Sequence, residues 1–182
     1  MTREVIRWDA AHRSDFFRVH CEAEGTGWCH CVAWWVPTWD GWGERTAEQN
    51  RQLREALCDR GEYDGYLLHV DGAPAGWCQA GLRDRLEKLV KQYRLTPDPA
   101  IWAITCFLIL PGFRRRGHSA FLLQGVLDDL RGRGAKRVEA YPKRGQGLDE
   151  GALWTGAESL YRSAGFEILR DDSARPVLSR TL

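Results

Sequence analysis

The chain has 182 residues and carries 26 Lys and Arg against 25 Asp and Glu, a formal net charge of +1 at pH 7. Hydrophobic residues make up 43% and charged residues 28%, a globular balance that excludes an intrinsically disordered chain. The near-zero net charge argues against broad nucleic-acid or membrane binding. No apolar run approaches the roughly 18 residues of a spanning helix.

We expect one domain over residues 1–182. Residues 1–9 are charged and lack an apolar signal core, which predicts a cytoplasmic protein.

The first elements alternate between short strands and helices. In chain order we expect a strand over 5–8, a helix over 10–20, an irregular segment over 21–43 and a helix from Thr46 to Gly61. Thr46 and Gln49 have the spacing of a capping box. Two strands over 66–70 and 75–79 flank the turn residues Asp71 to Pro74, which predicts a hairpin.

The second part of the chain contains the strongest strand pattern, the nearly continuous apolar run from 101 to 110. Such a run is typical of a central strand covered on both faces. Around it we expect a helix over 83–94, a basic loop over 111–116, a helix over 119–133, a strand over 137–141, a glycine-rich loop over 142–151, a helix over 157–164 and strands over 166–169 and 177–181.

A basic segment, Leu110 to Ser119, lies between this central strand and the helix that follows it. The start of a helix presents backbone N–H groups without helical partners, and their dipoles favour an anion. Gly117 leaves room for a phosphate, and three consecutive arginines add charged donors. This arrangement predicts a pyrophosphate-binding site; the alternative is a solvated basic loop.

The segment resembles motif A of the GNAT acetyltransferases, Arg/Gln-x-x-Gly-x-Gly/Ala, through Arg114, Gly117 and Ser119. Ser119 departs from the usual Gly or Ala, but it is small. The hairpin around Asp71 also resembles the second and third strands of the family. The segment 158–166, which ends in Gly165-Phe166, resembles its motif B. Three motifs in the right order are more specific than any one.

The resemblance implies an α/β (α+β) fold with a mixed, mostly antiparallel sheet of about seven strands flanked by helices. The sheet would be splayed between the strands at 101–110 and 137–141, and acetyl-CoA would lie in that opening as the co-substrate. Phe107 and Ile109 would offer main-chain groups to the pantetheine arm. The implied cofactor-binding residues are Phe107, Leu108, Ile109, Arg114, Arg115, Arg116, Gly117, His118 and Ser119.

Tyr161 matches the tyrosine that protonates the departing CoA thiolate in the family, although a core tyrosine would show the same pattern. The general base is less clear, because the strand 101–107 has no acidic residue where some family members place a glutamate. Glu139 on the next strand is the best candidate, followed by Asp149 and Glu150 in the loop. Each of these carboxylates has a solvated or structural role as its alternative.

The implied function is acetyl-CoA-dependent N-acetylation of a primary amine by direct attack in a ternary complex. A small-molecule amine is the expected acceptor, without nucleic acid or membrane, and a homodimer is allowed. The alternatives are acylation of a protein or peptide amine and a catalytically silent acyl-CoA-binding module. The missing strand carboxylate favours the silent module, whereas the intact Tyr161 disfavours it.

Cysteine, histidine and tryptophan concentrate in the irregular segment. His20-Cys21 and Cys29-His30-Cys31 have metal-ligand chemistry, but the Cys-x-Cys spacing is tighter than in common zinc sites, so we expect no metal. The six cysteines are expected to be buried free thiols. The neighbouring tryptophans would either wall an acceptor pocket or fill a core; they are Trp28, Trp34, Trp35, Trp39 and Trp42.

Overall fold

The computed structural model describes residues 1–23, 27–149 and 151–182. Its centre is a seven-stranded sheet with the order β1-β2-β3-β4-β5-β7-β6. The strands are β1 (Arg3–Arg7), β2 (Tyr66–Val70), β3 (Ala73–Leu82), β4 (Ile101–Ile109), β5 (Arg137–Ala140), β6 (Glu167–Arg170) and β7 (Val177–Thr181). Only the β4–β5 pair is parallel. The other neighbouring pairs are antiparallel, which confirms the predicted mixed and mostly antiparallel sheet.

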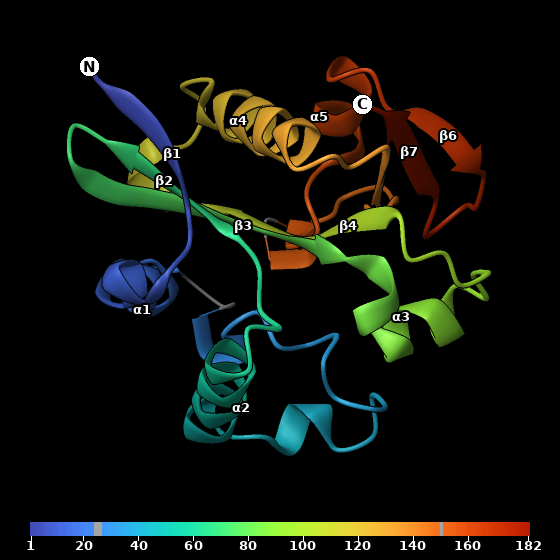
Figure 1. The fold of residues 1–182 in the computed structure, drawn as a ribbon, viewed down its shortest axis with the longest axis horizontal. Coiled ribbons are helices and arrows are strands. Elements are labelled where there is room, and N and C mark those ends of the chain that lie inside the picture. The colour runs from blue at the N-terminus through green and yellow to red at the C-terminus, as the bar shows by residue number, and fades with distance from the viewer. Residues whose placement is uncertain (24–26, 150) are drawn as a thin grey trace.

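Helices cover both faces of the sheet. They are α1 (Arg13–Glu22), α2 (Ala47–Asp59), α3 (Glu87–Gln92), α4 (His118–Gly132) and α5 (Glu158–Ser163). Figure 1 shows α4 and α5 on one side of the sheet and α1 and α2 on the other. The predicted capping box is present at the start of α2, where Thr46 and Gln49 bond to each other's backbone N–H groups.

Two predicted helices are shorter than expected. The helix expected over 10–20 begins as a 3-10 turn over Ala10–His12 that Asp9 caps, and α1 follows it. The helix expected over 83–94 is likewise a 3-10 turn, Arg83–Arg85, followed by the six-residue α3. This second helix is shortened because the side chain of Arg83 is buried and bonds to Glu139 of β5. This tertiary ion pair overrides the local helical pattern.

Apolar side chains on the two faces of the sheet form separate cores. The inward face of α4, with Leu122, Val126 and Leu130, packs on the sheet together with Tyr161. On the other face α1 contributes Phe16 to a core that includes Trp77 of β3. The sheet is therefore buried on both faces along β3 and β4, as the apolar run of β4 predicts.

The pairing of β4 with β5 stops partway along β4. Residues 101–104 of β4 pair with 137–140 of β5, and β5 then ends. The last five residues of β4 continue to Ile109, still paired with β3 on the opposite edge. The backbone groups of β4 that face away from β3 thus border the predicted opening.

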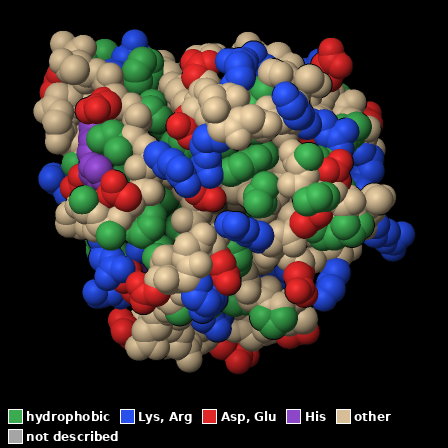
Figure 2. All heavy atoms as spheres, in the orientation of Figure 1, with side chains coloured by type: hydrophobic (Ala, Val, Ile, Leu, Met, Phe, Trp, Pro, Cys, Tyr) green, Lys and Arg blue, Asp and Glu red, His purple; other side chains and the backbone are tan. Residues whose placement is uncertain are grey.

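The surface carries charges of both signs. Figure 2 shows Lys and Arg side chains interspersed with Asp and Glu over the visible face. Within the part of the chain that the structure describes, no helix is long and apolar enough to cross a membrane.

Candidate active site

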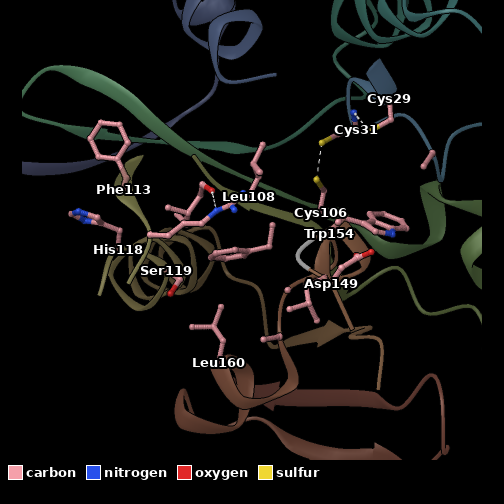
Figure 3. Close-up of a pocket in the computed structure, with 18 of the residues that line it drawn as sticks. Cys29, Cys31, Cys106, Leu108, Phe113, His118, Ser119, Asp149, Trp154 and Leu160 are labelled. Carbon is pink, nitrogen blue, oxygen red and sulfur yellow. Dashed lines mark hydrogen bonds between the residues drawn. The ribbon is translucent and has the colours of Figure 1, made fainter. Parts of the chain in front are cut away.

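A cavity of about 1310 Å³ lies where β4 leaves β5. Most of its lining comes from three parts of the chain: the end of β4 with the start of α4, the Trp- and Cys-rich segment between α1 and α2, and the segment from Asp149 into α5. His20 of α1 and Arg175 complete it. Figure 3 shows His118 and Ser119 at one end, the thiols of Cys29, Cys31 and Cys106 at the other, and Leu108 between them. All of the predicted cofactor-binding residues except Arg116 line this cavity.

The start of α4 has the geometry of an anion site. Gly117 precedes the helix with φ +76°, a left-handed conformation that favours glycine. The helical ladder begins with the Phe121 N–H group, which donates to the Gly117 carbonyl at 3.2 Å. The N–H groups of His118, Ser119 and Ala120 precede that bond and are available to a ligand. A Cβ atom at Gly117 would meet nothing within 4 Å, so the space in front of this turn is open.

The side chains of the basic loop differ in their positions. Arg114 Nε donates to the Ile109 carbonyl at 2.8 Å and thereby ties the loop to β4. Arg115 is exposed and lines the cavity, whereas Arg116 is exposed outside it. His118 is buried, and burial together with the charges of Arg3 and Arg116 lowers its pKa. A neutral imidazole therefore lies beside the N–H groups that begin α4.

The free edge of β4 is partly engaged by the protein itself. The Phe107 N–H group donates to the Trp154 carbonyl at 2.8 Å, and the Ile109 carbonyl accepts from Arg114. These two backbone groups are the ones expected to meet the pantetheine arm. The loop before α5 therefore occupies hydrogen-bonding positions that the resemblance assigns to the acyl donor. Sequence reasoning missed Trp154, because it lies between the predicted glycine-rich loop 142–151 and the next helix, in a stretch without periodicity.

Tyr161 lies behind the cavity wall. Its side chain is fully buried among Phe107 and Phe166, and its hydroxyl donates to the Thr155 carbonyl at 2.6 Å. Burial raises its pKa well above the usual value, so the phenol stays protonated at neutral pH. Gly156 separates this hydroxyl from the cavity. A Cβ there would lie 2.4 Å from the Tyr161 oxygen.

Glu139 does not lie in the cavity, where its predicted role as general base requires it to be. Its side chain is 1% exposed and does not line the cavity. Both carboxylate oxygens accept from Arg83 Nη1, at 3.2 and 3.1 Å, and one accepts from the Tyr141 hydroxyl at 2.5 Å. A carboxylate that is fully paired and enclosed has no access to an acceptor amine. The geometry therefore gives Glu139 a structural role.

Asp149 is the predicted carboxylate that does line the cavity. It is exposed, and one of its oxygens accepts the Ala152 N–H group at 2.6 Å, which fixes the turn ahead of Trp154. Figure 3 shows its side chain on the cavity side of the loop. The third candidate, Glu150, lies outside the described residues.

The tryptophans divide between the wall and the core. Trp28, Trp39 and Trp42 line the cavity, whereas Trp34 and Trp35 pack inside the protein. Lys88 of α3, which sequence reasoning missed, places its ammonium 3.4 Å from the centre of the Trp39 ring. Burial lowers the pKa of Lys88 to about 8. Both alternative roles of the tryptophans are thus present in one segment.

The cysteines are all free, but they are not uniformly buried, in contrast to the prediction. Cys21 is exposed, Cys29 and Cys58 are half-buried, and Cys31, Cys78 and Cys106 are buried. Among the residues that the structure describes, no group of three or more His, Cys, Asp or Glu side chains is arranged to hold a metal ion.

Comparison with known proteins gives a family and a fold. The model of the acetyltransferase (GNAT) family matches residues 28–166. No curated relative matches the sequence. Solved structures share the fold at low identity. An acetyltransferase from Thermus thermophilus is 16% identical with a TM-score of 0.60, over 100% of this chain and 98% of that one.

Two other solved structures are similar to the same extent. The PaiA N-acetyltransferase from Thermoplasma acidophilum, in complex with coenzyme A, is 11% identical with a TM-score of 0.56, over 100% of each chain. The ribosomal-protein-S18-alanine N-acetyltransferase from Escherichia coli is 12% identical with a TM-score of 0.58, over 99% of this chain and 94% of that one.

Proposed function

Because the chain belongs to the GNAT acetyltransferase family, whose members use acetyl-CoA, we propose that it acetylates the primary amine of a small molecule. The observation that supports this proposal most is the cavity itself. It joins an anion-binding helix start to the unpaired end of β4 and to an aromatic wall. One end suits a phosphorylated donor and the other an amine acceptor.

The donor would bind along the predicted residues. The pyrophosphate would accept hydrogen bonds from the N–H groups of His118 to Ala120, with Arg115 adding charge. The pantetheine arm would follow β4 from Ile109 toward Phe107. For that, the Trp154 carbonyl must release the Phe107 N–H group, so donor binding would move the loop before α5.

The transfer would proceed by direct attack in a ternary complex. The neutral amine attacks the acetyl carbonyl carbon and gives a tetrahedral intermediate. The C–S bond then breaks, and the electron pair leaves with sulfur. Asp149 would accept the amine proton, since it lines the cavity and Glu139 does not. Tyr161 would protonate the sulfur, because Gly156 leaves only a backbone between its hydroxyl and the cavity.

The acceptor site favours a small amine. Trp28, Trp39 and Trp42 form an apolar wall, and such rings bind flat or cationic groups. Asp149 adds the negative charge in the cavity that would attract an ammonium group. A small amine is thus bound on one side by rings and on the other by a carboxylate.

The direct test is release of free CoA thiol from acetyl-CoA over a panel of aromatic and aliphatic amines, with mass spectrometry of the products. We expect stoichiometric N-acetylated product from at least one small amine. Peptides that begin with alanine form the comparison arm. Turnover on peptides alone would establish a protein acceptor, and acetyl-CoA binding without turnover on either would establish a silent module.

A further inference from the structure

Three thiols from two separate parts of the sequence meet in the cavity. Cys29 and Cys31 come from the segment between α1 and α2, and Cys106 comes from β4. We propose that Cys31 and Cys106 are a redox-active thiol pair, which a hydroperoxide converts to a disulfide with Cys29 as the thiol that reacts first.

Cys31 is the centre of the cluster. Its sulfur lies 2.7 Å from Cys106 Sγ, although the two residues are 75 positions apart in the sequence. Figure 3 shows the two sulfurs facing each other across the end of the cavity. The Cys31 backbone N–H group also donates to Cys29 Sγ at 3.4 Å. A disulfide between Cys31 and Cys106 therefore needs little movement of either backbone.

His20 fixes the direction of the hydrogen bond at Cys31. Its Nδ1–H donates to the Phe16 carbonyl at 2.9 Å, so Nε2 of the neutral ring is the acceptor. Nε2 lies 3.1 Å from Cys31 Sγ, so it shares the single Cys31 thiol proton, as a hydrogen-bond acceptor, with Cys29 Sγ. Burial lowers the pKa of His20 to about 3, which keeps the ring neutral and able to accept a hydrogen bond.

Cys29 has the most reactive environment of the three thiols. A hydrogen bond with the Cys31 side chain lowers its pKa, whereas burial raises the pKa of Cys31 well above its usual value. Cys29 is also half-buried rather than buried and lines the cavity. Because a thiolate is the nucleophile toward peroxide, oxidation begins at Cys29.

The backbone around the cluster is held in an unusual conformation. His30 and Cys31 have φ values of 45° and 52°, a left-handed region that non-glycine residues adopt rarely. The Tyr63 hydroxyl donates to the His30 carbonyl at 3.1 Å and helps to hold this turn. Consecutive left-handed residues turn Cys31 toward His20 and Cys106, and such strain is common at functional sites.

Hydrogen peroxide is the oxidant in the proposed formation of the disulfide. The Cys29 thiolate attacks one peroxide oxygen, the O–O bond breaks, and Cys29 sulfenic acid and hydroxide form. The Cys31 sulfur then attacks Cys29, and the Cys31 thiol proton goes to the departing hydroxide, which leaves as water. Cys106 finally attacks the Cys31 sulfur and releases the Cys29 thiol. In total two thiols lose two electrons and peroxide becomes two waters.

The position of the pair connects oxidation to the acyl donor. Cys106 precedes Phe107, the residue at which β4 faces the opening. The disulfide would tie the segment that carries Trp28 and Trp42 to this strand. Acetyl-CoA in the cavity would block access of peroxide to Cys29, an expectation that rests on the proposed function. The formation of the Cys31–Cys106 disulfide does not depend on that function.

The experiment is peroxide oxidation of the full chain followed by alkylation and peptide mass mapping without reduction. We expect a Cys31–Cys106 cross-link in the wild-type protein, reversed by dithiothreitol. Cys29→Ser should give the same product at least about tenfold more slowly, because its thiolate starts the reaction. Cys106→Ser should shift the product to Cys29–Cys31. Cys21→Ser removes an exposed thiol outside the cluster and is the matched control.

Two outcomes overturn the proposal, and a third separates it from the proposed function. Unmodified Cys31 and Cys106 after exhaustive peroxide treatment, with circular dichroism showing a folded protein, would exclude the pair. Oxidation of Cys21 to sulfinic acid as the main product would mean that exposure alone decides reactivity. If the cross-link forms but acetyl-CoA does not slow it, the thiol pair stands and donor binding in this cavity fails.

Discussion

The hydroxyl of Tyr161 donates a hydrogen bond to the backbone carbonyl of Thr155 at 2.6 Å. This bond joins α5 to the loop that carries Trp154, whose carbonyl accepts from the Phe107 N–H group of β4. The proposed proton donor and the pantetheine edge are thus connected through one short loop. Movement of that loop when the donor binds would change the partner of Tyr161, as its proposed role as proton donor requires.

Tyr161→Phe keeps the buried ring and removes the proton. We expect kcat to fall at least about tenfold, because general-acid assistance contributes roughly 10²–10⁴-fold. The free energy of unfolding should fall by only about 1 kcal/mol, for the lost bond to Thr155. Steady-state kinetics and urea denaturation measure the two effects. Wild-type kcat with chemistry limiting turnover would leave Tyr161 as a core tyrosine.

Asp149→Asn removes the charge that the cavity offers to an amine. We expect kcat/KM for the acceptor to fall at least about tenfold, the lower part of the range for general-base catalysis. The Kd of acetyl-CoA should stay within about twofold of wild type, in keeping with a role toward the acceptor alone. Asp59→Asn, at the exposed end of α2, is the matched control. An unchanged kcat/KM in Asp149→Asn would exclude the residue as base.

Glu139→Gln tests whether that carboxylate is structural. The guanidinium of Arg83 is buried with it, at 3% and 1% side-chain exposure, and in the variant it keeps only Asp84, at 3.2 Å, as a charged partner. Breaking a buried pair typically costs about 3–5 kcal/mol, so we expect the free energy of unfolding to fall by roughly 3 kcal/mol. The kcat of the folded fraction should not change. A loss of kcat without a loss of stability would restore the role as base.

The buried histidines make stability depend on pH. Burial lowers the pKa of His20 from 6.5 to about 3 and that of His30 to about 4. The unfolded chain therefore binds protons below pH 6.5 that the native protein does not, so stability is full above pH 6.5 and falls toward pH 4. At about pH 5 the expected loss is about 2 kcal/mol for each histidine.

Urea denaturation of wild type and His20→Gln across this pH range measures the effect. The variant should lose part of the histidine-dependent slope, whatever its absolute stability, while His30 and His118 keep their contributions. His12→Gln, which changes a half-buried imidazole paired with Asp9, is the control. Equal slopes in wild type and His20→Gln would show that His20 titrates normally in the folded protein.

Local signals in the sequence predicted much of the fold, because the interactions behind them span few residues. The capping box of Thr46 and Gln49 and the hairpin between β2 and β3 are of this kind. The buried ion pair of Glu139 could not be predicted, because its partner Arg83 is 56 positions away. The contact between Cys31 and Cys106 spans 75 positions. No periodicity in either segment signals such a pairing, which depends on how the sheet is assembled.

Acetyl-CoA binding at the start of α4 is the central claim, and titration calorimetry on Gly117 variants tests it most directly. We expect wild type to bind one acetyl-CoA per chain. Gly117→Ala, which strains the left-handed turn at φ +76° but adds no charge, should bind several-fold more weakly, since such strain costs about 1–2 kcal/mol. Gly117→Glu should show no binding, because its carboxylate points into the space for the pyrophosphate. Wild-type affinity in a folded Gly117→Glu protein would contradict the account.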